Sequence, residues 1–176
     1  MSTRVDAELL GRDVSTDVPG SWLAFWLVVM RVVGGWWLLH AGLDKIWAWP
    51  FDAAWFVGGK ATGTSLGPVV TLFDSGVLLD FVNVAIPLGQ TAIGLGLIVG
   101  AMTRTAAFFG AVLLLFFFII NGETGAWSHG VVTVELLGIV LYGAIASLGA
   151  GRVLGIDAYL VETDVVRSHP RLRYLL

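Results

Sequence analysis

The sequence contains no cysteine and few charged residues, and both deficits narrow the classes of protein that it can encode. Without cysteine, the chain cannot form disulfides, thiolate zinc sites, cysteine-ligated iron–sulfur clusters or a cysteine nucleophile. Charged residues make up 13% of the 176 residues and hydrophobic residues 57%, whereas ordinary globular chains are about 25% charged and about 45–50% apolar. This balance excludes a disordered chain and a soluble enzyme with a polar shell, and it predicts that the lipid bilayer is the chain's environment.

Positive charge is scarce as well. The formal net charge is −3, and lysine occurs only at Lys45 and Lys60. Nucleic-acid binding depends on a basic field, so we expect no nucleic-acid partner. We also predict no metal site.

Four long apolar stretches predict transmembrane helices. They cover residues 22–42, 81–103, 105–122 and 130–151. A helix of about 20 residues crosses a hydrocarbon core of about 30 Å, and a backbone in lipid must satisfy its own hydrogen bonds. The predicted fold class is therefore all-α: a polytopic membrane protein built as a four-transmembrane-helix bundle.

The segments outside these spans predict how the chain is oriented. Residues 1–21 and 152–176 are predicted tails, and residues 43–80 form a long loop rich in tryptophan and other apolar residues. Such a loop is expected to form short helices in the outer interface. Most of the arginines fall in the tails and in the turn between the second and third spans, whereas both lysines fall on the opposite side. The positive-inside rule then predicts a cell-membrane protein with both termini in the cytoplasm.

Arg31 lies deep in the first predicted span, where a charge is costly and needs a partner. Steps of three and four residues place Gly35, Leu38, Gly42 and Lys45 on the same helical face. The two glycines permit close approach of another helix. Both cations are therefore expected to face the bundle interior or one shared cavity.

Glu135 is the acid that we expect to pair with one of these cations. It lies in the outer half of the fourth predicted span, and its helical face continues to Tyr142. Pairing of Glu135 with Lys45 or Arg31 would remove the cost of two buried charges.

Further polar residues map to the same outer half of the bundle. They are His40 and Asp44 near the end of the first span, Asn83 on the second, Asn121 and Glu123 near the end of the third, and His129 ahead of the fourth. Gln90 lies on the helical face of the second span that includes Asn83. Charged and polar groups within a membrane mark functional sites by default. We therefore predict a polar chamber that opens outward.

Three groups of residues resemble a known family in their order and spacing. The first is Arg31-x-x-Gly34 followed by the run 40–45, His-Ala-Gly-Leu-Asp-Lys; the second is the run 94–104; the third comprises Val134-Glu135-Leu136-Leu137 and the run 149–157. Together they resemble the DoxX family of small four-helix membrane proteins, which includes the DoxD-type subunits of thiosulfate:quinone oxidoreductase. The resemblance covers roughly residues 22–160. It departs from the family at Gln90, where an acid is common.

The resemblance implies a membrane subunit of a redox system that binds quinone and passes electrons to it from a sulfur compound such as thiosulfate. On this hypothesis Arg31, Glu135 and Gln90 are the candidate catalytic residues. The candidate substrate-binding residues are Lys45, His40, Asp44, Asn83 and Tyr142. No covalently bound cofactor is expected, because the chain has no cysteine and could hardly store electrons itself.

Two other hypotheses stay open at this stage. One is a non-catalytic membrane anchor for a redox partner, suggested by the arginines at positions 167, 171 and 173 of the C-terminal tail. The other is a small-solute carrier, which four spans could form as a homo-oligomer. A haem held by His40 and His129 is disfavoured, because both histidines lie near the outer surface.

Overall fold

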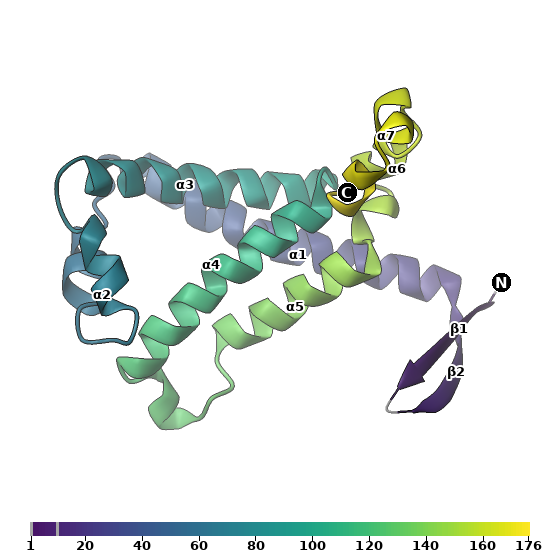
Figure 1. Ribbon diagram of the computed structural model, residues 1–176, viewed down its shortest axis with the longest axis horizontal. Helices are drawn as coiled ribbons and strands as arrows, with labels where there is room; N and C mark the ends of the chain where they lie inside the picture. Colours follow the sequence, from purple (N-terminus) through teal and green to yellow (C-terminus); the bar gives the residue numbers. More distant parts are fainter. Residues whose placement is uncertain (1, 10) are drawn as a thin grey trace.

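The computed structural model describes residues 2–9 and 11–176, and a bundle of four long helices dominates it (Figure 1). The long helices are α1 (Gly20–Trp47), α3 (Gly76–Val99), α4 (Thr103–Glu123) and α5 (Val134–Leu148). The shorter helical segments are η1 (Trp55–Lys60), α2 (Gly67–Val70), η2 (Thr71–Phe73), η3 (Ala126–His129), η4 (Ala150–Arg152), α6 (Ile156–Leu160), α7 (Asp164–Ser168) and η5 (Pro170–Tyr174). The most extensive helix contacts are those of α1 with α3 and of α4 with α5. The predicted helical bundle is confirmed in this coarse form.

Among the described residues, three helices are long and apolar enough to cross a membrane: α1, α3 and α4. The fourth, α5, has 15 residues, which corresponds to about 22 Å. The predicted helix at residues 130–151 is therefore wrong in its bounds. Thr133 is extended and its side chain caps the helix by accepting from the Leu136 amide at 3.5 Å, and Gly149 ends the helix at a φ of +62°.

The helical hairpin of α3 and α4 also begins and ends at other residues than predicted. α3 starts at Gly76 rather than at residue 81, because Ser75 is extended and the helix begins directly after it. Gly100 ends α3 with a φ of +71°, a conformation that glycine adopts without strain. The turn between the two helices is therefore at residues 100–102, whereas the predicted spans 81–103 and 105–122 place it at residue 104.

Residues ahead of the bundle form an antiparallel hairpin of β1 (Ser2–Leu9) and β2 (Arg12–Pro19), with Arg4 opposite Asp17. Polar and apolar residues alternate along Arg4–Glu8 in the sequence, which is the period of a strand. The all-α prediction did not include this hairpin. Residues 1 and 10 of the predicted N-terminal tail lie outside the described residues.

The bundle has two different ends (Figure 1). At one, which we call the termini end, lie the N-terminal hairpin, the α3–α4 turn and residues 149–176. At the other, which we call the capped end, residues 48–75 and 124–133 cover the long helices. The two termini and the α3–α4 turn thus share one end of the bundle.

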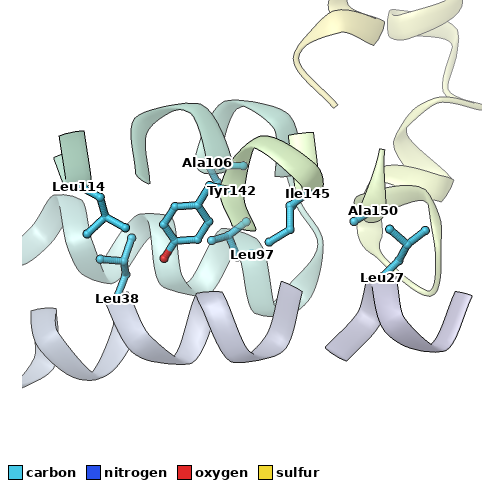
Figure 2. Packing of buried hydrophobic residues seen from close by; sticks show 9 residues of the cluster. Leu27, Leu38, Leu97, Ala106, Leu114, Tyr142, Ile145 and Ala150 are labelled. Atoms are coloured by element: carbon cyan, nitrogen blue, oxygen red, sulfur yellow. The ribbon is translucent and has the colours of Figure 1, made fainter. Parts of the chain in front are cut away.

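The main core lies between the long helices. Figure 2 shows Leu38 of α1, Leu97 of α3, Leu114 of α4 and Tyr142 of α5 packed together. Leu97 and Tyr142 are completely buried. All four helices therefore contribute to one apolar core.

A second, smaller core lies at the capped end. Val57 and Ala61 of the long loop and Val70 of α2 are buried together with Ile120 of α4. The predicted long loop therefore folds into short helical turns that pack on the bundle.

The outer surface of the helices is apolar. Large side chains such as Trp36 on α1, Leu88 on α3, Phe108 on α4 and Leu137 on α5 are each more than half exposed. Water-soluble monomers rarely expose apolar surface this continuously. The exposed faces fit association with a lipid bilayer.

Candidate functional site

A cavity of about 570 Å³ lies at the capped end, between the long loop and the ends of α1, α3 and α4. Its aromatic walls are Phe51, Trp55, Phe56, Phe73, Phe116 and Phe117, and its aliphatic walls include Val69, Val82, Ile86 and Leu113. The polar side chains in the lining are Lys45, Lys60 and Asn121. The volume falls within the range of about 300–1,000 Å³ that is typical of small-molecule sites.

Lys45 enters the cavity from the last turn of α1. Its Nζ donates to the Ala41 carbonyl at 2.9 Å and lies 5.9 Å from the centre of the Phe51 ring. This ring position is a cation–π geometry. One of the three ammonium donors is therefore used within the helix, and Phe51 holds the charged group beside the cavity.

The side-chain amide of Asn121 connects Lys60, which lines the cavity, to Glu135. Lys60 Nζ donates to Asn121 Oδ1 at 2.6 Å, and Asn121 Nδ2 donates to Glu135 Oε1 at 2.7 Å. Glu135 is within electrostatic range of Lys60. Glu135 therefore bonds to Asn121, not to Lys45 or Arg31 as predicted. The lysine that the long loop brings near Glu135 is Lys60 rather than Lys45. Asn121 was predicted from the sequence only as one of the residues of the outer polar chamber, and no role was predicted for Lys60.

Two further contacts fasten the loop over the cavity. The Ala53 amide donates to Asn83 Oδ1 at 2.7 Å, and the amide and hydroxyl of Ser65 both donate to the Glu123 carboxylate at 2.6 Å. Asn83 therefore holds the backbone of the loop and is not among the residues that line the cavity.

His40 and Asp44 lie on the outer surface of α1. Their side chains form a pair at 3.0 Å, each about 60% exposed. The His40 ring also packs against Trp36, with ring centroids 6.0 Å apart. Neither residue lines the cavity, so the structure does not bring this predicted pair to the same site as Lys45.

Gln90 is buried in α3, and its Oε1 has no hydrogen-bond partner within residues 2–9 and 11–176. It follows Val82 and Ile86 at steps of four residues, so it lies one helical turn beyond the cavity wall on the same face.

Arg31 points to the other end of the molecule. Its side chain is 2% exposed, and its guanidinium donates to the carbonyls of Ala150, Val153 and Leu154 at 3.0, 3.0 and 3.2 Å. Fourteen residues of α1 separate Arg31 from Lys45, which is about 21 Å along the helix axis. Of the two options predicted for these cations, the shared cavity is therefore wrong, whereas Arg31 does face the buried interior.

Asp157 completes this buried cluster at the termini end, and sequence analysis did not single it out. It is completely buried and accepts from the amides of Met102 and Thr103 at 2.7 and 2.9 Å. Its own amide donates to the Gly100 carbonyl at 2.8 Å. Asp157 thus caps the start of α4 and is the acid in electrostatic range of Arg31. The signal was available, because Asp157 ends the motif at 149–157.

Tyr142 lies in the main core and not in the cavity (Figure 2). Its hydroxyl donates to the Gly34 carbonyl at 2.8 Å, and the ring packs against Gly34 and Gly110. Tyr142 was predicted to bind substrate, but the structure places it in the main core and not in the lining of the cavity.

Replacement of Tyr142 by phenylalanine tests this placement. The loss of one buried hydrogen bond is expected to lower the free energy of unfolding by about 0.5–1.5 kcal/mol and to leave ligand affinity unchanged. Thermal unfolding of the purified protein in a mild detergent measures the first quantity, and binding of a quinone analogue measures the second. A variant of unchanged stability that has lost affinity would restore the substrate-binding role.

Taken together, these features define a helical, membrane-type bundle with a capped apolar cavity at one end and a buried arginine cluster at the other. Comparison of the chain with protein-family models, curated proteins and solved structures finds no match. The resemblance to the DoxX family therefore depends on the residues quoted for it alone.

Proposed function

We propose that the chain is a multi-pass protein of the cell membrane that crosses it four times, with both termini in the cytoplasm. The three long apolar helices support this topology, and α5 would be the fourth and shortest span. The cap would then lie in the outer interface. The arginines near the termini end support the orientation, because positive residues concentrate on the cytoplasmic side. They are Arg4, Arg12, Arg104, Arg152, Arg167, Arg171 and Arg173.

Within that membrane, we propose that the protein binds a quinone-type ligand as a subunit of a redox system. The observation that carries this proposal is the cavity, which combines six aromatic walls with three polar groups. A planar ring can stack on the aromatic walls while an isoprenoid tail lies against the aliphatic ones. Lys45, Lys60 and Asn121 are the donors within reach of a ring carbonyl.

The sequence-based roles change under this proposal. Lys45 keeps its role in binding the substrate, and Gln90 supplies a hydrogen-bond acceptor one turn deeper. Glu135 acts through Asn121 and is a positioning residue. Arg31 is a structural residue, because three backbone carbonyls already occupy its guanidinium.

The electron donor would act from outside this chain or through a partner, since the chain has no cysteine with which to hold electrons. Transfer from thiosulfate to quinone is what the resemblance implies. The alternative of a non-catalytic anchor has support of its own. Leu154, Tyr159 and Tyr174, which lie at the termini end beyond the long helices, are 87%, 77% and 76% exposed and could contact a partner subunit.

Replacement of Ile86 by phenylalanine tests the proposed quinone site. Ile86 lines the cavity, and a larger side chain would fill space that the ring needs, since cores tolerate added volume poorly. We expect quenching of tryptophan fluorescence by a short-tailed ubiquinone analogue in nanodiscs to show at least about ten-fold weaker binding, which is about 1.4 kcal/mol.

The matched control is Leu88→Phe, because Leu88 is on the same helix and is 55% exposed. This variant should bind the analogue with the affinity of the parent protein. If the two variants bind equally well, the cavity is not the quinone site.

A further inference from the structure

The charge of the cavity is not balanced within it. Lys45 and Lys60 are the only lysines of the chain, and both line this cavity, whose lining contains no acid. The nearby acids lie outside the lining: Asp44 pairs with His40 on the surface of α1 within electrostatic range of Lys45, and Glu135 bonds to Asn121 within electrostatic range of Lys60. The lining therefore presents two positive charges in an otherwise apolar space.

Each ammonium also has unused hydrogen-bonding capacity. Across residues 2–9 and 11–176, Lys45 donates only to the Ala41 carbonyl and Lys60 only to Asn121. An ammonium has three donors, so each retains two. Lys45 is only partly exposed, and apolar surroundings make an unpaired charge costly. An oxyanion between the two lysines would remove that cost for Lys45 and would also pair with the exposed Lys60.

The neutral head of a quinone leaves part of this capacity unused. A ring carbonyl can accept a hydrogen bond from an ammonium but carries no charge that would balance it, whereas a carboxylate does both. The cavity volume of about 570 Å³ suits one molecule of drug size, which favours a single tail over the two tails of a phospholipid. Trp55 and Lys60 are exposed, so a ligand can reach the cavity from the surface.

We propose that the cavity takes a single-tailed anionic amphiphile, with its carboxylate between Lys45 and Lys60 and its tail against the aromatic and aliphatic walls. This inference rests on the same cavity as the proposed function and deepens it by stating the charge of the preferred head group. The carboxylate accepts the free ammonium protons, and Phe51 and Asn121 hold the two lysines in position.

The test compares two ligands that differ only in the head group. Tritiated laurate and tritiated dodecanol are bound to the full chain in phosphatidylcholine nanodiscs, with uptake by empty nanodiscs subtracted. We expect laurate to bind at least about ten-fold more tightly than dodecanol, because only laurate carries a negative charge that can pair with the two ammoniums. Equal affinity for the two ligands would overturn the proposal.

Variants locate the effect. The double substitution Lys45→Gln and Lys60→Gln should remove the preference for laurate, and dodecanol that still binds the double variant shows that the cavity is folded. Arg152→Gln removes an exposed cation at the termini end and should leave both affinities as in the parent. A double variant that keeps the preference would overturn the assignment to these lysines.

Two more measurements separate this inference from its alternatives. If phosphatidylglycerol is retained by the two lysines during purification and laurate does not bind, the head group comes from a membrane phospholipid and the single-tail proposal is wrong. If the ubiquinone analogue binds and laurate shows no advantage over dodecanol, this inference fails and the proposed function stands. If laurate binds at these lysines and the analogue does not, the proposed function fails and this inference stands.

Discussion

Replacement of Arg31 by methionine is expected to lower the free energy of unfolding by about 3–5 kcal/mol, as breaking a buried charged network does in other proteins. Three backbone carbonyls, those of Ala150, Val153 and Leu154, would lose their donor. Asp157 would lose the positive charge that faces it. Methionine fills similar space without donating a hydrogen bond, so the loss measures the polar contacts rather than a cavity.

Arg152→Met is the matched control, because Arg152 is at the same end of the bundle and its side chain is exposed. Chemical unfolding in mixed detergent micelles, followed by far-UV circular dichroism, compares the two variants. Arg31→Lys should recover only part of the loss, since an ammonium cannot present the guanidinium fork. Equal stability of Arg31→Met and Arg152→Met would contradict the structural role and return Arg31 to the candidate ligand-binding residues.

The buried face of the first helix could be predicted from the sequence. Helical spacing placed Arg31, Gly35, Leu38 and Gly42 on one stripe, and all four are buried. The direction in which Arg31 reaches along the axis was not predicted. Helical side chains tilt toward the N-terminus of their own helix, so the guanidinium extends toward the termini end. There it meets residues 150–154, more than a hundred positions later in the chain.

Glycines complete that arginine site in a way that spacing alone cannot show. A Cβ on Gly100 or on Gly155 would lie 2.6 Å from Arg31 Nη1. Because neither Gly100 nor Gly155 has a side chain, both leave room for the guanidinium, although they are far apart in the sequence. The reason that glycine is needed at both positions is this contact with Arg31, which lies far away in the sequence. The sequence motif indicates only that small residues are needed there.

The character of the cavity was predicted only in part. Polar residues of four spans mapped to one depth, which suggested a polar chamber, but depth along a helix does not determine which side chains point inward. His40 and Asp44 face outward and pair with each other. The long loop instead inserts Phe51, Trp55 and Phe56, which makes the chamber apolar apart from two lysines and an amide. A loop that packs in this way has no helical periodicity in its sequence from which its contacts could be predicted.

Gly94→Ala is the second substitution with a large expected effect. Gly94 of α3 crosses α1, and an added Cβ would lie 2.6 Å from Leu39 Cα and 2.7 Å from the Gly35 carbonyl. Both contacts are with backbone, which cannot rotate away, so the two helices must separate. We expect a loss of about 3 kcal/mol or more in the free energy of unfolding, at or above the upper end for overpacked sites.

Gly89→Ala on the same helix is the control, because nothing lies within 4 Å of its added Cβ. Alanine is a better helix former than glycine by up to about 1 kcal/mol, so this control should match or exceed the stability of the parent. The two variants carry the same chemical change and are predicted to shift stability in opposite directions. Unfolding in mixed micelles measures both shifts. If Gly94→Ala and Gly89→Ala have the same free energy of unfolding, the close crossing of α1 and α3 is not present in the folded protein.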